Sequence, residues 1–185
     1  MRLNRVTKRY GDQTVLSDVS LTVSAGERIC LLGRSGIGKT TVLRLLMGLE
    51  KPDAGTVEGG DRLRFSAVFQ ENRLLPWYTA EQNLRLFVGD DAPLWLNRVQ
   101  LTEAAHKRPE ELSGGMKRRL ALARALGQPS DAVLLDEPFA GLDSVTADRM
   151  TALIDQSLGQ RSLVLVTHDE SRAQALGCSI IRLGT

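Results

Sequence analysis

The chain has 185 residues, 42% of them hydrophobic, and its 24 Lys and Arg nearly balance 22 Asp and Glu, giving a formal net charge of +2. This length fits one domain that buries about 70% of the surface of the unfolded chain. The pI near 8.7 lies below the strongly basic range typical of nucleic-acid binding, so we expect no nucleic-acid partner.

Neither a signal peptide nor a membrane span is expected. No apolar segment opens the chain, and no stretch approaches the ~20 apolar residues that cross a bilayer. Two cysteines, Cys30 and Cys178, are too few for a disulfide framework, and both are expected to be buried. We therefore expect a cytoplasmic protein.

The first elements along the chain are predicted to be antiparallel strands. Residues 2–23 alternate between apolar and polar side chains, with a turn at residues 11–12. Short strands are expected again over residues 55–69, and the Gly-Gly pair at residues 59–60 predicts a hairpin turn between them. These segments indicate an N-terminal antiparallel β subdomain.

Between these strands, a glycine-rich run predicts a phosphate-binding loop. It lies between an apolar strand predicted over residues 27–32 and an amphipathic helix predicted over residues 40–49. The spacing G-x-x-x-x-G-K-[ST] lets backbone N–H groups surround the phosphates of a nucleoside triphosphate, and the helix N-terminus favours an anion. An ordinary Gly/Ser turn is the alternative, which the flanking elements disfavour.

Two side chains of this loop have predicted roles. Lys39 is expected to reach the outer phosphates, and the Thr40 hydroxyl is expected to bind Mg²⁺. The predicted nucleotide-contacting residues of the loop are Gly33, Arg34, Ser35, Gly36, Ile37, Gly38, Lys39, Thr40 and Thr41.

The rest of the chain is predicted to alternate helices and strands. Helices over residues 81–87 and 93–99 begin a helical insert, which spans about residues 79–115. Later helices are predicted over 115–126, 148–158 and 170–176, and apolar strands over 132–135, 162–166 and 179–183. The pattern predicts an α/β fold with a mostly parallel sheet covered on both faces, in a single domain of residues 1–185.

Two adjacent carboxylates, Asp136 and Glu137, follow the strand predicted over residues 132–135. They are expected at the carboxyl edge of the sheet, beside the phosphate loop. Asp136 is expected to hold Mg²⁺ together with Thr40, and Glu137 to act on water. Adjacent acids in a turn are just as often exposed capping groups, but the phosphate loop makes the catalytic interpretation the better one.

The order of the motifs resembles that of the nucleotide-binding subunits of ATP-binding cassette (ABC) transporters, from about residue 3 to residue 183. Residues 112–116 (L-S-G-G-M) resemble the signature loop of that family, with Met116 where glutamine is most common. Gln70 matches the Q-loop, residues 141–143 the D-loop and His168 the switch histidine. The resemblance implies a P-loop NTPase core that binds ATP and Mg²⁺ and hydrolyses ATP.

The resemblance also assigns roles to residues. It implies that Glu137, His168 and Gln70 are catalytic and that Gln70 is also a metal ligand. In the family, two subunits pair head to tail in an ATP-dependent way, which here would place Ser113, Gly114 and Gly115 on the ATP of the partner, with Asp143 reaching across the same interface. The alternative is that this Ser-Gly-Gly sequence is an ordinary helix cap.

Tyr10 and His168 each have a simpler alternative. Tyr10 lies at the spacing of the aromatic residue that stacks on adenine in the family, but it can also be a strand tyrosine at the edge of the β subdomain. His168 follows the strand predicted over residues 162–166 and is expected at the same edge as Glu137, although a lone histidine is usually an ordinary polar residue.

The resemblance implies partners in a membrane. The segment from Gln70 to Trp77 lies where the family docks its permease subunits, and its L-L-P-W sequence is similar to that of importers for nitrate, sulfonates and taurine. The alternative is that Trp77 packs on the helical insert. The chain is thus expected on the inner face of the cell membrane, with a solute-binding protein in the full system.

Two other functions compete with transport. One is a soluble ABC-type ATPase in DNA repair or on the ribosome, which generally needs a coiled coil, zinc module or second cassette. The other is a kinase or GTPase that acts alone, which leaves residues 113–115 and His168 without a role. The basic residues 117–119 are expected to form a solvated face.

Overall fold

The computed structural model describes residues 1–184, so residue 185 of the predicted domain lies outside the described residues. Three strands form an antiparallel sheet in the order β2-β1-β4. They are β1 (Arg2–Tyr10), β2 (Gln13–Thr22) and β4 (Ala54–Glu58). Strands β1 and β2 are joined by the turn predicted at residues 11–12, which confirms the N-terminal antiparallel subdomain.

A second sheet has five strands, all parallel, in the order β5-β6-β7-β3-β8. They are β3 (Arg28–Leu32), β5 (Phe65–Val68), β6 (Ala132–Asp136), β7 (Ser162–Val166) and β8 (Ser179–Arg182). Every residue of β6 and β7 is buried, as expected for strands covered on both faces. The parallel sheet and the α/β class are therefore confirmed.

The hairpin predicted at residues 59–60 is wrong. Strand β4 pairs with β1 in the antiparallel sheet, whereas β5 pairs with β6 in the parallel sheet, so the two glycines lie where the chain crosses between sheets. A Cβ at Gly60 would lie 2.5 Å from the carbonyl oxygen of Leu46. Glycine is thus needed here for close backbone approach to the end of a helix rather than for a two-residue turn.

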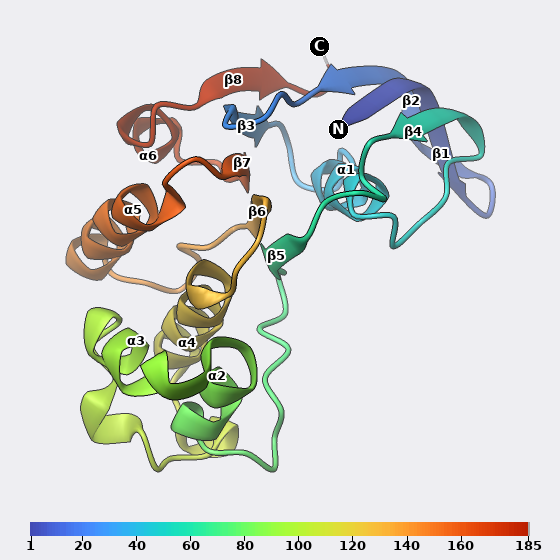
Figure 1. The fold of residues 1–185 in the computed structure, drawn as a ribbon. Coiled ribbons are helices and arrows are strands. Elements are labelled where there is room, and N and C mark those ends of the chain that lie inside the picture. The colour runs from blue at the N-terminus through green and yellow to red at the C-terminus, as the bar shows by residue number, and fades with distance from the viewer. Residues whose placement is uncertain (185) are drawn as a thin grey trace.

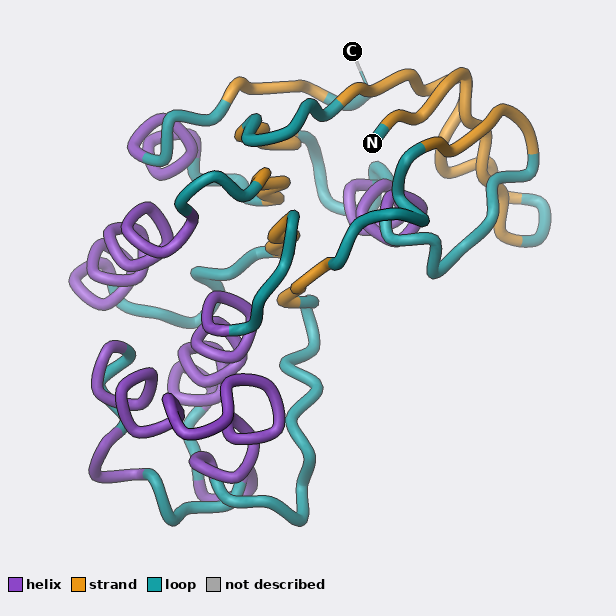
Figure 2. The backbone as a smooth tube through the Cα atoms, in the orientation of Figure 1, coloured by secondary structure: helices purple, strands orange, loops and turns teal. Residues whose placement is uncertain are grey.

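The described residues 1–184 form six α-helices (Figures 1 and 2). They are α1 (Lys39–Leu46), α2 (Ala80–Val88), α3 (Ala92–Arg98), α4 (Gly114–Gly127), α5 (Ser144–Leu158) and α6 (Glu170–Ala175), and short 3-10 turns cover Gly89–Asp91, Thr102–Ala104 and Pro109–Glu111. Figure 1 shows α2, α3 and α4 together at one end of the molecule, away from the antiparallel sheet.

The core has two parts, one on each face of the parallel sheet. Ile29 and Leu31 of β3 face α1 and the antiparallel sheet, whereas Cys30 and Leu32 face the helices on the opposite side. Successive side chains of a strand point to opposite faces, so a strand buried on both faces needs an unbroken apolar sequence. The residues of β3 that face α1 pack against its apolar side. Helix α1, which follows β3, is therefore held beside the edge of the sheet that carries the candidate site.

The two cysteines differ in exposure. Cys30 is buried, as expected, whereas Cys178 is only partly buried, and both are free thiols. Burial raises the pKa of the Cys30 thiol to about 12 and that of Cys178 to about 11. Both groups therefore stay protonated at neutral pH, which disfavours reactivity.

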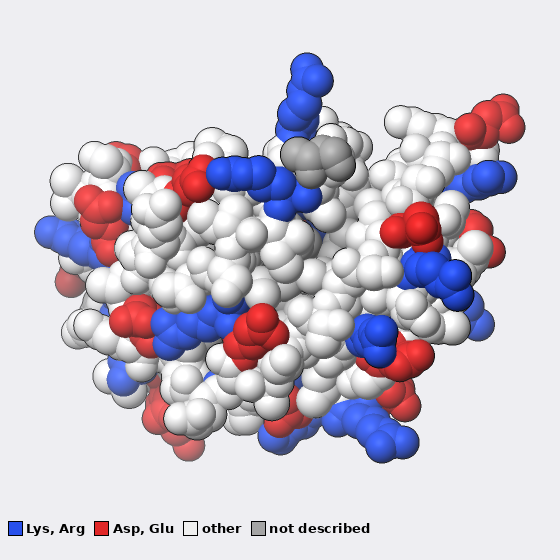
Figure 3. Space-filling view, turned by 90° about the horizontal axis from the view of Figure 1, so that it is seen from above, with Lys and Arg blue, Asp and Glu red and all other residues white. Residues whose placement is uncertain are grey.

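The surface carries mixed charge. On the face shown in Figure 3, Lys and Arg are interspersed with Asp and Glu. Ion pairs at the surface include that of Arg182 with Glu170. Within residues 1–184, no helix is both long enough and apolar enough to cross a membrane.

Candidate functional site

A cavity of about 390 Å³ opens at the carboxyl end of the parallel strands, within the size range of small-molecule sites. Its lining residues come from the end of β1, from β2, from the loop between β3 and α1 and the first turn of α1, from the segment after β5, and from the ends of β6 and β7. They are Tyr10, Val15, Ser35, Gly36, Gly38, Lys39, Thr40, Thr41, Gln70, Asp136, Glu137 and Val166. The cavity thus brings the two carboxylates together with Tyr10, Gln70 and much of the phosphate loop. The predicted nucleotide and catalytic residues that do not line it are Gly33, Arg34, Ile37, Ser113, Gly114, Gly115, Asp143 and His168.

The glycine-rich loop leads directly into α1. Gly38 is the N-cap of this helix and has a φ of +101°, a conformation that L side chains rarely adopt. A Cβ at Gly38 would also lie 2.5 Å from a methyl group of Leu16. The Lys39 ammonium donates to the carbonyl oxygens of Gly33 at 2.7 Å and Arg34 at 3.0 Å. The positive charge therefore lies against the loop at the helix N-terminus, where anions are favoured.

Thr40 and Asp136 meet inside the cavity. The Thr40 hydroxyl donates to Asp136 Oδ2 at 2.6 Å, and Asp136 is buried at the end of β6. A hydroxyl and a carboxylate side by side are the oxygen ligands that Mg²⁺ prefers, and Mg²⁺ usually takes its other ligands from water and phosphates. Within residues 1–184, no three His, Cys, Asp or Glu side chains gather to hold a metal by themselves. The donor set thus fits a Mg²⁺ ion that arrives with a phosphate ligand.

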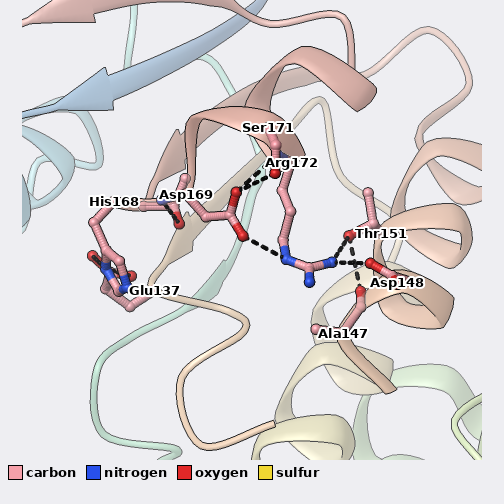
Figure 4. A network of polar contacts seen from close by, with 9 residues as sticks. Glu137, Ala147, Asp148, Thr151, His168, Asp169, Ser171 and Arg172 are labelled. Atoms are coloured by element: carbon pink, nitrogen blue, oxygen red, sulfur yellow. Dashed lines mark hydrogen bonds and ion pairs between the residues drawn. The ribbon is translucent and has the colours of Figure 1, made fainter. Parts of the chain in front are cut away.

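Glu137 lies in an unusual backbone conformation next to His168. Its φ is +49°, which costs a non-glycine residue roughly 1–3 kcal/mol, and its N–H donates to the carbonyl oxygen of Val166 at 2.9 Å. The Glu137 carboxylate lies 3.2 Å from His168 Nδ1 (Figure 4). The strained turn, fixed to the end of β7, therefore brings together the two residues predicted to act on water. The His168 side chain is 83% exposed.

Tyr10 is the last residue of β1 and lines the cavity with 42% of its surface exposed. Its hydroxyl donates to the Glu50 carboxylate, and the Lys8 ammonium lies 5.5 Å from the centre of its ring. One contact thus holds the hydroxyl, and the other lies over the face of the ring. This exposure disfavours the alternative in which Tyr10 only fills the edge of the antiparallel sheet.

The predicted signature and D-loop residues lie together, but in a different cavity. This second cavity, of about 680 Å³, shares no lining residue with the first. It is lined by Asn72, Ser113, Gly114, Gly115, Met116, Arg118, Arg119, Ala140, Gly141, Leu142, Asp143 and Thr146. Within one chain, therefore, residues 113–115 do not face the phosphate loop.

Two helices begin at this second cavity. The Ser113 hydroxyl accepts from the N–H of Met116 at the start of α4, and Asp143 accepts from the N–H of Thr146 at the start of α5. These hydrogen bonds hold the pKa of Asp143 below its usual range. Asn72 Oδ1 is buried here without a hydrogen-bond partner among the described residues. Ser113 is thus a helix cap, and it can still present N–H groups to an anion.

The solvated face predicted for residues 117–119 is wrong for Arg118, which is only 5% exposed. Its guanidinium donates to the carbonyl oxygens of Phe69 at 2.6 Å and Gln70 at 2.7 Å. Burial lowers the pKa of Arg118, which the Asp136 and Glu137 carboxylates oppose. The sequence analysis missed this residue, whose one signal was a basic side chain among the apolar positions of α4.

The segment after Gln70 is ordered by Asn83 of α2. The Asn83 side chain accepts from the N–H of Leu75 and donates to the carbonyl oxygens of Leu75 and Tyr78. Trp77 is 65% exposed and contacts the ring of Tyr78 edge-on, at 6.5 Å between ring centres. The alternative in which Trp77 packs into the helical insert is therefore disfavoured.

Comparisons with known proteins give similarities in sequence and in fold. Residues 16–140 match the family model described as "ABC transporter". The chain is 44% identical over 191 residues to the "Aliphatic sulfonates import ATP-binding protein SsuB" of Burkholderia pseudomallei (strain K96243), covering 98% of this chain and 58% of the relative. The same-named protein of Burkholderia thailandensis is also 44% identical, with 98% and 57% covered. The chain thus spans a little under three fifths of the length of these relatives.

The fold of this chain is similar to that of a solved structure over nearly the whole length of both chains. It is described as the "Dimeric structure of a post-hydrolysis state of the ATP-binding cassette MJ0796 bound to ADP and Pi", with a TM-score of 0.86 and 30% identity. The match covers 98% of this chain and 93% of that one. With the family match over more than half of the chain, these similarities show that the chain belongs to the ABC transporter family, as a cassette with the fold of its ATP-binding proteins.

Proposed function

We propose that the chain is the ATP-binding and ATP-hydrolysing subunit of an ABC importer for a small anion. The observation that carries the proposal is the cavity in which Lys39, the Thr40–Asp136 pair and Glu137 converge. The names of the relatives support import, and aliphatic sulfonates are the solute class that those names suggest. They favour transport over the alternative in DNA repair or on the ribosome.

In the proposed reaction, the loop and the N-terminus of α1 bind the phosphates of ATP. Thr40, Asp136 and Gln70 would hold Mg²⁺, which would supply positive charge to the phosphates. Glu137 takes a proton from the water whose oxygen bonds to the γ-phosphorus, while the bond from the γ-phosphorus to the oxygen bridging the β- and γ-phosphates breaks. The products are ADP and inorganic phosphate, and Lys39 stabilises the charge that develops on the phosphates. His168 lies against Glu137 and keeps the carboxylate and water in register. Tyr10 stacks on the adenine base.

The two cavities support a head-to-tail pair of chains. Residues 113–115 lie in the second cavity, so they reach a phosphate only on another chain, with Asp143 beside them. The solved relatives are dimeric, and one holds ADP and Pi. A ligand drives such closure by its differential affinity for the closed state, which a γ-phosphate bound by both chains provides.

Dilution tests the paired site. We expect phosphate release per chain to fall in proportion to protein concentration once the chain is diluted below its dimerisation constant, because the fraction of paired chains then scales with concentration. The measurement is phosphate release with Mg²⁺ and ATP from micromolar to nanomolar chain. A constant rate per chain over that range would instead indicate an enzyme that acts alone, such as a kinase or GTPase.

We also propose that the segment from Gln70 to Trp77 docks permease subunits, which places the chain on the inner face of the membrane. The exposed Trp77 is suited to an interface, where tryptophan is often a hot spot. A solute-binding protein would complete the importer.

Trp77→Ala should weaken binding to the co-expressed permease subunits roughly 30-fold while the ATPase activity of the free chain is kept. Affinity is measured by titrating the chain onto permease reconstituted in nanodiscs. Leu49→Ala is the matched control, because Leu49 is also exposed but lies just after α1. Equal affinity of the Trp77→Ala chain and its parent would refute the docking site.

A further inference from the structure

Arg172, on α6, joins the loop of His168 to a neighbouring helix (Figure 4). Its Nε pairs with Asp169 Oδ2 at 2.8 Å, and its Nη1 pairs with Asp148 Oδ1 of α5 at 2.6 Å. The Arg172 side chain is only 14% exposed, whereas Asp148 is mostly exposed. One guanidinium thus lies between two carboxylates that belong to different segments of the chain.

Two further contacts extend this bridge. Arg172 Nη1 donates to the Thr151 hydroxyl at 3.4 Å, and that hydroxyl donates to the carbonyl oxygen of Ala147 at 2.8 Å. The guanidinium also lies 5.3 Å from the ring centre of Phe139, two residues after Glu137. A planar guanidinium donates in several directions at once, whereas a lysine ammonium acts as a point charge on a flexible stem. Arg172 therefore contacts α5, the loop of His168 and Asp169, and the segment of Phe139 at the same time, which a lysine would not do.

The bridge restrains the loop that carries His168. Asp169, the next residue, caps α6 by accepting from the N–H of Arg172 and the hydroxyl of Ser171, and its own N–H donates to the Thr167 hydroxyl. The hydrogen bond from Ser171 and the contacts with Arg172 hold the pKa of Asp169 below its usual range, so its carboxylate stays charged. The His168 imidazole itself has one side-chain partner in the described part of the chain, Glu137.

The other end of the bridge leads to the second cavity. Asp148 lies in the first two turns of α5, the helix that Asp143 caps. Asp148 therefore lies near the end of α5 that borders the second cavity, and a rigid movement of this helix would displace Asp143, Asp148 and the guanidinium of Arg172 together.

We propose that Arg172 is a positioning residue that holds His168 against Glu137 by tying its loop to α5, and that it links the Asp143 end of α5 to the histidine. The expected effect of Arg172 on catalysis rests on the proposed ATP hydrolysis, whereas its effect on the position of His168 does not. Without the guanidinium, Asp148 and Asp169 lose their shared cation, and the loop is free to move away from Glu137.

The test compares Arg172→Gln and Arg172→Lys with a matched control, Arg182→Gln, which removes a different ion pair of α6. Arg182→Gln breaks the ion pair of Arg182 with Glu170, which joins α6 to β8 rather than to α5. The first readout is the ring C2 proton resonance of His168 in the nucleotide-free chain. The chain has two histidines, so His106→Gln assigns the pair of signals.

We expect the His168 resonance to move or broaden in Arg172→Gln, while the His106 resonance stays in place and Arg182→Gln leaves both unchanged. In phosphate-release assays, Arg172→Gln should lower kcat roughly 10- to 100-fold, the effect of a small misplacement, with KM for ATP within about twofold of the parent. Arg172→Lys should recover part of the loss.

Three results would overturn the proposal. The first is a His168 resonance that is unchanged in Arg172→Gln. The second is a His168 resonance that shifts equally in Arg182→Gln, because a general loss of stability would shift it in both variants. The third is an unchanged kcat for Arg172→Gln in a parent that hydrolyses ATP. If the parent shows no hydrolysis, the proposed function fails, and the resonance alone still decides whether Arg172 holds His168.

Discussion

The Glu137→Gln variant should bind ATP and yet hydrolyse it roughly 10² to 10⁴ times more slowly than the parent, the usual contribution of general-base assistance. The amide has nearly the same shape as the carboxylate and keeps a hydrogen-bonding oxygen toward His168 Nδ1, which lies 3.2 Å from the carboxylate. It cannot take a proton from water, however. The Thr40–Asp136 pair is untouched, so phosphate and metal binding should remain.

Phosphate release in single-turnover assays measures the chemical step, and ATP affinity is measured separately by equilibrium titration. Glu27→Gln is the matched control. Glu27 lies just before β3, at the end of this strand opposite the cavity, and its carboxylate accepts from the N–H of Ser24. It should hydrolyse ATP like the parent. A Glu137→Gln chain that releases phosphate at the parental rate would remove Glu137 from the catalytic role.

This variant should also reveal the paired state. If hydrolysis separates the two chains, a chain that binds ATP without hydrolysing it should accumulate as a dimer with ATP, visible by light scattering. The separation of the two cavities gives the reason, because residues 113–115 cannot reach the nucleotide held by Lys39 of the same chain. A monomeric Glu137→Gln chain at saturating ATP would argue against the composite site.

Much of the fold follows from local pattern. The strand predicted over residues 162–166 has the same bounds as β7, and the strand predicted over residues 132–135 ends one residue short of β6. Both are runs of apolar residues because both faces of the sheet are covered. The pattern of parallel strands also predicted that Asp136 and Thr40 would meet. Asp136 lies at the carboxyl end of its strand, and Thr40 follows the loop at the carboxyl end of another. The structure places the Thr40 hydroxyl 2.6 Å from Asp136 Oδ2.

The failures all depend on partners that are distant in the chain. The Gly-Gly pair at residues 59–60 marked a change of direction, but the pairing of β4 with β1 and of β5 with β6 depends on the whole sheet order. Arg118 was assigned to a solvated face because a run of three basic residues says nothing of which one points inward. It is held by carbonyl oxygens at residues 69 and 70.

The contacts of Arg172 also could not be predicted from the sequence. It lies in a short helix whose sequence gives no signal for its contact with Asp148, 24 positions away. Long-range ion pairs of this kind have no local periodicity, so they are visible only once the helices are packed. The catalytic roles of Gln70 and His168 likewise stay predictions that rest on the family resemblance, although the structure brings His168 to Glu137.

The composite site makes its sharpest prediction for a mixture of two inactive chains. Lys39→Ala removes the phosphate-binding ammonium, and Gly114→Asp places a carboxylate where the γ-phosphate of a partner's ATP is proposed to bind. A Cβ at Gly114 would have no atom within 4 Å, and an acidic residue in the first turn of a helix is favourable, so this chain should fold normally. Each chain alone should be at least roughly 100-fold slower than the parent.

An equal mixture should recover activity. Each mixed pair has one site built from the intact loop of the Gly114→Asp chain and the intact residues 113–115 of the Lys39→Ala chain. Its other site carries both changes. Random pairing makes half of the dimers mixed, so the mixture should reach about one quarter of the parental rate per chain if the two sites act independently in a symmetric dimer. Phosphate release after mixing measures this recovery, and a mixture no faster than its components would mean that residues 113–115 do not complete the site of another chain.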